Sequence, residues 1–174
     1  MNKPTQPSPM VGRPYFPEGY IPAKIEAELL PWSYVQERMT SAIHYWIATA
    51  TLQGKPYVSP VWGVWVDDLL YFDGSPQTRR GRNIAANPQT AVHLESGEQA
   101  VFMNGATNIY HNAPDRSLAE RLAQAYRQKY TVFGYSPEPD QWDQGGLFVF
   151  TPHVAFAWKN FIKDPTRFVL RQAD

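Results

Sequence analysis

Cysteine is absent from this chain of 174 residues, which excludes disulfides, thiolate nucleophiles and cysteine metal sites. There is also no excess of charge, because 16 basic residues balance 16 acidic ones. A neutral chain has no overall field to hold a nucleic acid or an anionic membrane. No signal peptide is evident, and no apolar run approaches the roughly 18 residues that a membrane span requires. We therefore expect a cytoplasmic protein with no nucleic-acid or membrane partner.

Recognisable catalytic motifs are missing as well. The eleven glycines form neither G-x-G-x-x-G nor G-x-x-x-x-G-K-[ST]. There is no G-x-S-x-G elbow and no H-E-x-x-H pair. The four histidines, His44, His93, His111 and His153, are too far apart in the chain for a local metal motif. A cofactor that brings its own chemistry would account for this lack of side-chain catalysts.

Proline is concentrated at the start of the chain: seven of the 16 prolines fall within residues 1–31, which show no sustained helical or strand period. We predict a proline-rich arm over 1–31, with its first ten residues mobile, followed by one domain over 32–174. Tyr15, Phe16 and Tyr20 suggest that part of the arm packs on a surface, either its own or that of a partner subunit.

The rest of the chain is rich in aromatic and β-branched residues. These predict a mainly β fold, a barrel or sandwich of about six antiparallel strands with peripheral helices. The strands are expected at 44–51, 56–66, 69–72, 90–96, 99–110 and 145–159, and helices at 33–43, 78–87 and 115–130. Ser33 and Gln36 suggest a capping box for the first helix.

An arginine cluster stands out in "SPQTRRGRN", residues 75–83. If Thr78 caps the helix, Arg79, Arg80 and Arg82 lie near its N-terminus, where each cation is disfavoured by about 0.3–1 kcal/mol. A phosphate bound there would reverse this penalty, since helix N–H groups and guanidinium groups both bind anions. The alternative is a solvated basic helix end, partly compensated by Asp73. The residues alone leave both interpretations open.

The order of the motifs resembles the flavin-binding split barrels related to pyridoxamine 5′-phosphate oxidase, particularly the flavin/deazaflavin oxidoreductase branch. The resemblance extends over most of 33–170. It rests on the strand "SPVW" (59–62), "TRRGRN" (78–83), Asn87-Pro88 and the late "AFAWKN…PTRFVL". It implies an FMN-binding split barrel that acts as a homodimer with sites at the interface.

The resemblance also implies a set of cofactor-binding residues. Arg80 would hold the cofactor phosphate, helped by Thr78, Arg79 and Arg82, with Asn83 holding the turn and Asp73 beginning the loop beneath. The strand Ser59, Pro60, Val61 and Trp62 would line the ring, and Trp158 and Arg167 would approach it, often from the second subunit. On residue type alone, Trp62 and Trp158 could equally be core or interface aromatics, and Arg167 a surface ion pair.

One departure concerns the substrate. Members that oxidise vitamin B6 carry Arg-x-His near the C-terminus, whereas this chain has Arg167-Phe168-Val169. The resemblance therefore implies an oxidoreductase that moves hydride between FMN, or the deazaflavin coenzyme F420, and another small organic substrate. A non-catalytic cofactor binder, carrier or sensor is the alternative.

Overall fold

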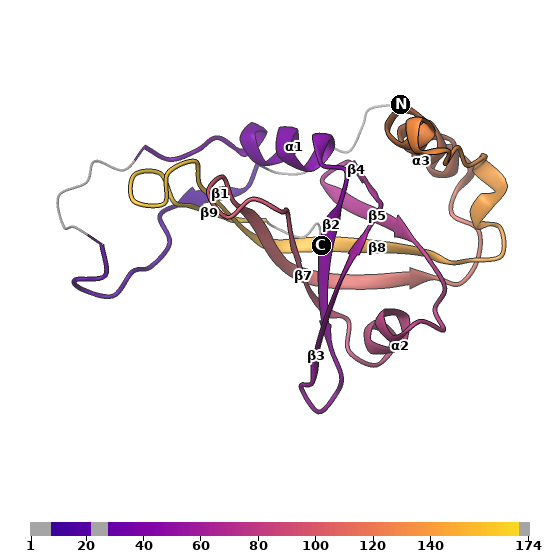
Figure 1. Cartoon of the computed structure of the whole chain (residues 1–174), viewed down its shortest axis with the longest axis horizontal. Coiled ribbons are helices and arrows are strands. Elements are labelled where there is room, and N and C mark those ends of the chain that lie inside the picture. Colours follow the sequence, from indigo (N-terminus) through magenta and orange to yellow (C-terminus); the bar gives the residue numbers. More distant parts are fainter. Residues whose placement is uncertain (1–7, 22–27, 171–174) are drawn as a thin grey trace.

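The computed structural model describes residues 8–21 and 28–170, which form an antiparallel sheet flanked by helices (Figure 1). The strands are β1 (Met10–Gly12), β2 (Tyr45–Ala50), β3 (Pro56–Val61), β4 (Val64–Val66), β5 (Leu69–Asp73), β6 (Gln89–His93), β7 (Val101–Tyr110), β8 (Leu147–Ala157) and β9 (Thr166–Val169). The helices are α1 (Trp32–Ser41), α2 (Arg79–Ala86) and α3 (Arg116–Tyr130), with two 3₁₀ turns, η1 (Thr131–Phe133) and η2 (Pro139–Trp142).

The nine strands pair antiparallel in the order β1-β9-β8-β7-β6-β2-β3, while β5 pairs with both β4 and β8. The predicted mainly β split-barrel class is therefore confirmed. All six predicted strand segments are present, but the segment 56–66 divides at Trp62 and Gly63 into β3 and β4. β1 and β9 were not predicted. Because β1 pairs with β9, part of the predicted arm is the edge strand of the sheet.

A tight turn and two polar contacts position the first helix. Asp67 and Asp68 join β4 to β5 with positive φ angles of 52° and 60°, the backbone that a two-residue hairpin requires. The Asp68 carboxylate accepts hydrogen bonds from Trp32 Nε1 (3.1 Å) and Gln36 Nε2 (2.8 Å). The predicted capping box is therefore wrong: α1 follows Pro31, which makes no side-chain cap, and Gln36 is committed to the hairpin instead.

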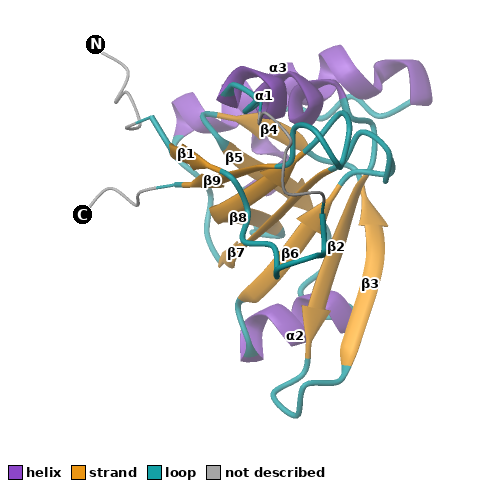
Figure 2. Cartoon of the chain, turned by 90° about the vertical axis from the view of Figure 1, so that its left-hand side faces the viewer, coloured by secondary structure: helices purple, strands orange, loops and turns teal. Residues whose placement is uncertain are grey.

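The other two helices begin as the sequence predicts. Thr78 Oγ1 accepts from Gly81 N at the start of α2, and Asp115 accepts from Ser117 N and Leu118 N at the start of α3. In Figure 2, α1 and α3 lie at one end of the sheet and α2 at the other. None of the helices within residues 8–21 and 28–170 has the length and apolar character needed to cross a membrane.

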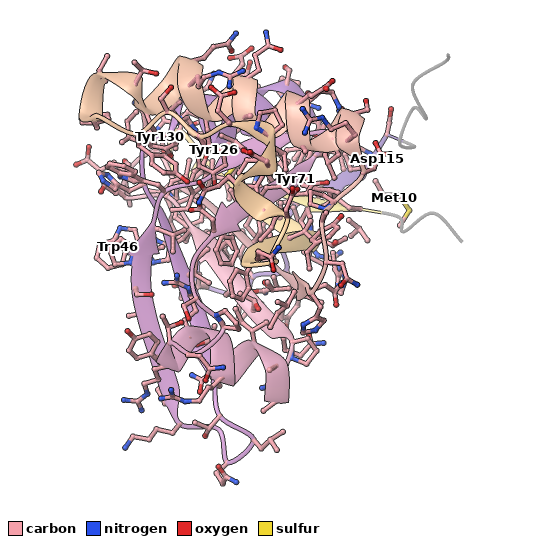
Figure 3. All side chains as sticks on the ribbon, turned by 90° about the vertical axis from the view of Figure 1, so that its right-hand side faces the viewer. Met10, Trp46, Tyr71, Asp115, Tyr126 and Tyr130 are labelled. Carbon is pink, nitrogen blue, oxygen red and sulfur yellow. The ribbon has the colours of Figure 1, made fainter. Side chains whose placement is uncertain are left out.

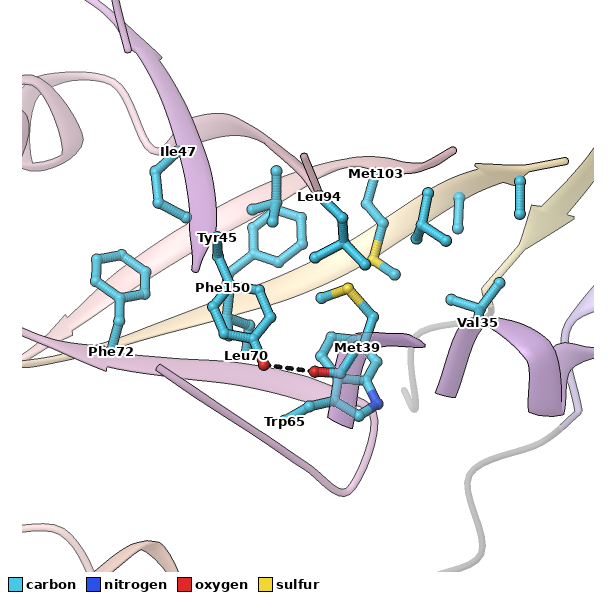
Figure 4. Packing of buried hydrophobic residues seen from close by; sticks show 14 of the residues in the cluster. Val35, Met39, Tyr45, Ile47, Trp65, Leu70, Phe72, Leu94, Met103 and Phe150 are labelled. Carbon is cyan, nitrogen blue, oxygen red and sulfur yellow. Dashed lines mark hydrogen bonds between the residues drawn. The ribbon is translucent and has the colours of Figure 1, made fainter. Parts of the chain in front are cut away.

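Two hydrophobic clusters hold these layers together. The first fills the inner face of the sheet against α1, and Figure 4 shows Met39 packed among Tyr45, Trp65 and Phe150. The second lies between α3, η2 and the β4–β5 hairpin, where Tyr71, Tyr126 and Tyr130 meet (Figure 3). The sheet is thus covered by helices on both sides near β5, but only on its inner side near β2 and β6.

The opposite, outer face of β2, β6, β7 and β8 is apolar too. The strand register places Pro60, Trp46, His93, Phe102, Phe156 and Arg167 in one row across the sheet. Trp46 and His93 stack at 6.1 Å between ring centroids, and Phe102 and Phe156 at 4.9 Å. Trp46 projects from the β2 ribbon on this side (Figure 3). Neither cluster includes these aromatic residues.

Candidate functional site

The loop that leads into α2 is held in one conformation by its own short side chains. Thr78 Oγ1 donates to Ser75 O at 2.8 Å while it accepts from Gly81 N at 3.0 Å. Gly81 packs directly on the loop, because a Cβ there would lie 2.5 Å from Pro76 O. The first turn of α2 is therefore fixed against residues 75–78, with the free N–H groups of a helix start beside it.

Arg80 points from this turn toward the end of the sheet. Its Nη1 donates to Ser59 Oγ at 3.0 Å, and its guanidinium carbon lies 5.6 Å from the centre of the Phe72 ring. Arg80 Nε is buried and has no hydrogen-bond partner among the described residues. No described carboxylate oxygen lies within 4.0 Å of the guanidinium. Burial consequently lowers the pKa of Arg80, although Tyr57 and Asp73 oppose that shift.

The other residues of the cluster divide between the site and the scaffold. Arg79 is exposed and lies 5.1 Å from the centre of the Tyr57 ring on β3, next to Arg80. Arg82 donates to Gln77 O and so braces the loop from outside. Asn83 is buried and donates to Thr49 Oγ1 at 3.0 Å on β2. Asn83 therefore ties the helix to the sheet, and the turn is held by Thr78 and Arg82.

A pocket of about 340 Å³ lies beside this loop and is lined in part by Asp73, Gly74, Trp62, Tyr135 and Trp142. Trp62 stacks on Tyr130 at 4.9 Å and forms an aromatic wall. Gly74 lines the pocket and also lies next to Arg80, because a Cβ added at Gly74 would lie 3.1 Å from Arg80 Nη2. Trp142 lies beside Asp73 in this pocket and lowers the pKa of that carboxyl as a hydrogen-bond donor. The pocket can therefore accept a flat group on Trp62 while an attached anion reaches Arg80.

Asp73 is the acidic residue of this pocket. Its carboxylate accepts a hydrogen bond from the Tyr135 hydroxyl. Burial raises the pKa of Asp73 above its usual value, and the hydrogen bond from Tyr135 and the charge of Arg80 only partly offset this. Burial and the Asp73 carboxylate likewise raise the pKa of Tyr135. The pair can hold a proton at the pocket wall.

The remaining predicted residues lie elsewhere. Val61 is buried in the inner core, and Pro60 is on the outer face. Trp158 donates from Nε1 to Gly97 O at 3.0 Å, and Arg167 is exposed on β9 opposite Phe156. Trp158 follows the end of β8, whereas Asp73 pairs with Leu147 at its beginning. The two ends of β8 are ten residues apart in the chain, which corresponds to a distance of about 30 Å along the strand.

The chain matches the family model for pyridoxamine 5′-phosphate oxidase over residues 34–159, most of its length. The chain belongs to this family. No curated protein matches it. The basic residues on which the resemblance rested, Arg79, Arg80 and Arg82, lie in the first turn of α2, and the matched range includes them.

Several solved structures share the fold of this chain at low identity. A putative pyridoxamine 5′-phosphate oxidase from Listeria innocua is 11% identical with a TM-score of 0.56, over 74% of this chain and 98% of the other. An F420 reductase is 16% identical with a TM-score of 0.50, over 79% and 93%. HutZ, the heme storage protein from Vibrio cholerae, is 18% identical with a TM-score of 0.52, over 69% and 88%.

Two residues of this pocket, Tyr135 and Trp142, were not predicted from the sequence. Tyr135 and Trp142 lie in the connection between α3 and β8, which carried no motif. Proline at 137 and 139 indicates a loop, and the aromatic residues beside them could have suggested that the loop packs on the sheet. Their pairing with Asp73 depends on how β5 and β8 align, which is a tertiary property.

Proposed function

We propose that this member of the pyridoxamine 5′-phosphate oxidase family binds a phosphorylated flavin-type cofactor, FMN or the deazaflavin F420. The proposed activity is hydride transfer between that cofactor and a small organic substrate. The observation that carries the proposal is Arg80: a half-buried cation with an unpartnered Nε, no described carboxylate within 4.0 Å, and a helix N-terminus beside it. A cation in this position is destabilised unless an anion accompanies it.

Each residue near the site then has a role. Arg80 and Arg79 would hold the phosphate, and Ser59 would orient the Arg80 guanidinium. Trp62 would provide a flat apolar wall and exclude water from one side of the ring. Asp73 and Tyr135 could hold a proton next to it. The flavin or deazaflavin ring would supply the hydride chemistry itself, which explains why the chain lacks a nucleophile motif.

We further propose that the protein is a homodimer joined through the outer face of β2, β6, β7 and β8. An antiparallel sheet with one solvated face alternates apolar and polar residues, but here the outer row carries Trp46, Phe102 and Phe156. A second copy on this face would bury that row. It would also bring the partner's Trp158 and the partner's Arg167 into reach of a cofactor site too distant to receive them from the same chain.

Cofactor titration of an Arg80→Ala variant tests the proposal. The dissociation constant for FMN or F420 should rise about tenfold to a hundredfold, the range for loss of a charge-assisted hydrogen bond. The matched control is Arg116→Ala, which removes an exposed arginine that pairs with Glu120 on α3. Riboflavin lacks the phosphate, so its affinity should be the same for Arg80→Ala and the unmodified protein. Unchanged affinity for both phosphorylated cofactors in Arg80→Ala would refute the site.

A second candidate, heme binding without catalysis, is favoured by one contact. His93 Nδ1 lies 2.8 Å from Leu94 O, which places the ring proton on Nδ1 and leaves the Nε2 lone pair available to a metal. His93 also lines an apolar pocket of about 450 Å³ together with Trp158. In this case hemin should produce a ligated Soret band that is lost in His93→Ala and retained in His44→Ala. A band of equal strength in both variants would exclude His93 as the ligand.

A further inference from the structure

A second pocket shares no lining residue with the pocket that contains Asp73. Its volume is about 390 Å³, and it opens between the end of α1, strand β4 and helix α3. Ile43, Val64, Trp65 and Ala125 give it apolar walls, and Lys129 is its one charged lining residue. The proposed cofactor site does not use any of these residues.

Lys129 is held at this pocket by two hydrogen bonds. Its Nζ donates to Tyr45 Oη at 2.8 Å and to Gly63 O at 3.2 Å. The nitrogen also lies 4.9 Å from the centre of the Tyr45 ring and 5.6 Å from that of Tyr130. A tetrahedral nitrogen with one carbon and two acceptors has a single position left. In the neutral amine that position holds the lone pair, which is free for an electrophile.

The surroundings favour the neutral amine. No described carboxylate lies within 4.0 Å of Lys129, and the groups packed against it are phenols and a carbonyl. Burial lowers the pKa of Lys129 to about 8. The pKa of Tyr45 and that of Tyr130 are both raised by burial, so these neighbours stay uncharged near neutral pH.

We propose that Lys129 is a reactive amine that takes a small aldehyde with an apolar body into this pocket and forms an imine with it. The lysine nitrogen attacks the carbonyl carbon, a C–N bond forms, and the carbonyl oxygen leaves as water with both hydrogens of the amine. One proton from solvent then converts the imine to an iminium, whose single N–H can be donated to Gly63 O. No electron acceptor or donor is required. The apolar walls suit the body of the aldehyde, and the amine selects its carbonyl group.

Competitive labelling within the full chain tests this proposal. The protein is treated at pH 7.5 with benzaldehyde and sodium cyanoborohydride, which reduces each imine to a stable amine, and peptides are quantified by mass spectrometry. The exposed Lys55, Lys159 and Lys163 serve as internal references. About a quarter of an amine with a pKa of about 8 is neutral at this pH, against about 0.1% for a lysine at its usual value. Lys129 should therefore be labelled at least about tenfold faster than the references.

Two variants separate the pocket from the lysine. Ala125→Leu narrows the pocket and should slow labelling of Lys129 severalfold, while Gln124→Leu adds the same side chain on the exposed side of α3 and should not. Labelling of Lys129 at or below the rate of the references overturns the reactive amine. If the two variants change the labelling rate of Lys129 equally, the proposal that the aldehyde binds in this pocket is wrong. The labelling rate of Lys129 in the unmodified protein tests the reactive amine even if a variant fails to fold.

Discussion

Asp73 shows how burial and charge compete at one residue. Because its pKa is raised in the folded state, the folded protein binds more protons than the unfolded chain between about pH 4 and the folded pKa of Asp73. The free energy of unfolding should therefore lose a contribution as the pH rises through the folded pKa of Asp73. Asp73→Asn has no carboxylate and should lack this loss.

Urea unfolding of the two proteins between pH 4 and 7 measures the effect. The stability of the unmodified protein relative to Asp73→Asn should decrease as the pH rises. Asp143→Asn removes an exposed carboxylate and is the control. Parallel profiles for the unmodified protein and Asp73→Asn would show that Arg80 and Tyr135 offset the burial of Asp73 completely.

Single residues differ in how well the sequence predicts them. Arg80 was predicted as the phosphate-binding residue because three arginines near a helix start conflict with the helix dipole. The structure shows its Nε buried without a partner and no described carboxylate within 4.0 Å, and phosphate binding itself stays a prediction. Asn83 and Arg82 belong to the same motif, yet one faces Thr49 and the other Gln77. The motif specifies which residues gather at the turn, but the helix phase determines which of them faces the site.

Gly105 controls the pairing of the two longest strands. The register of β7 and β8 shifts between Asn104 and Gly105, and a Cβ at Gly105 would lie 2.1 Å from Thr151 O and 2.9 Å from Pro152 Cα. Gly105→Ala should therefore force the strands apart and reduce the free energy of unfolding by about 1–3 kcal/mol or more.

Thermal and urea unfolding of Gly105→Ala check this prediction. Gly97→Ala is the matched control, because a Cβ at Gly97 would have no atom within 4 Å. The control should unfold close to the unmodified protein. If both variants unfold alike, the strands near the bulge can adjust without cost.

Among the helices and strands, the sequence predicted those features that depend on neighbouring residues, such as helix starts and strand alternation. Thr78 and Asp115 cap α2 and α3, and the alternating residues of β2 and β7 lie where the pattern predicted. The edge strand β1 and its neighbour β9 have three and four residues, too short for a period to be visible. They are defined by pairing, β1 with β9 and β9 also with β8, which no local sequence pattern reveals. The same holds for α1, whose start is set by Asp68 and not by a capping box.

The apolar outer face of β2, β6, β7 and β8 is the reason to expect that the whole molecule is a dimer. Ala91 lies near the centre of this face, opposite Ala48 on β2 and Asn104 on β7. If two copies pack on it, Ala91→Asp buries an unpaired carboxylate in each copy, at a cost of several kcal/mol. In a monomer the same carboxylate would remain in water at little cost.

Light scattering after size exclusion distinguishes these cases. The unmodified protein should have twice the chain mass of 19.9 kDa, and Ala91→Asp the mass of one chain. Gln124→Asp, on the exposed side of α3, should remain a dimer. The FMN affinity of Ala91→Asp should fall as well, because a monomer lacks the partner's Trp158 and the partner's Arg167. An unmodified protein that is monomeric at every concentration would contradict the shared site and leave Arg80 with only its own chain to complete it.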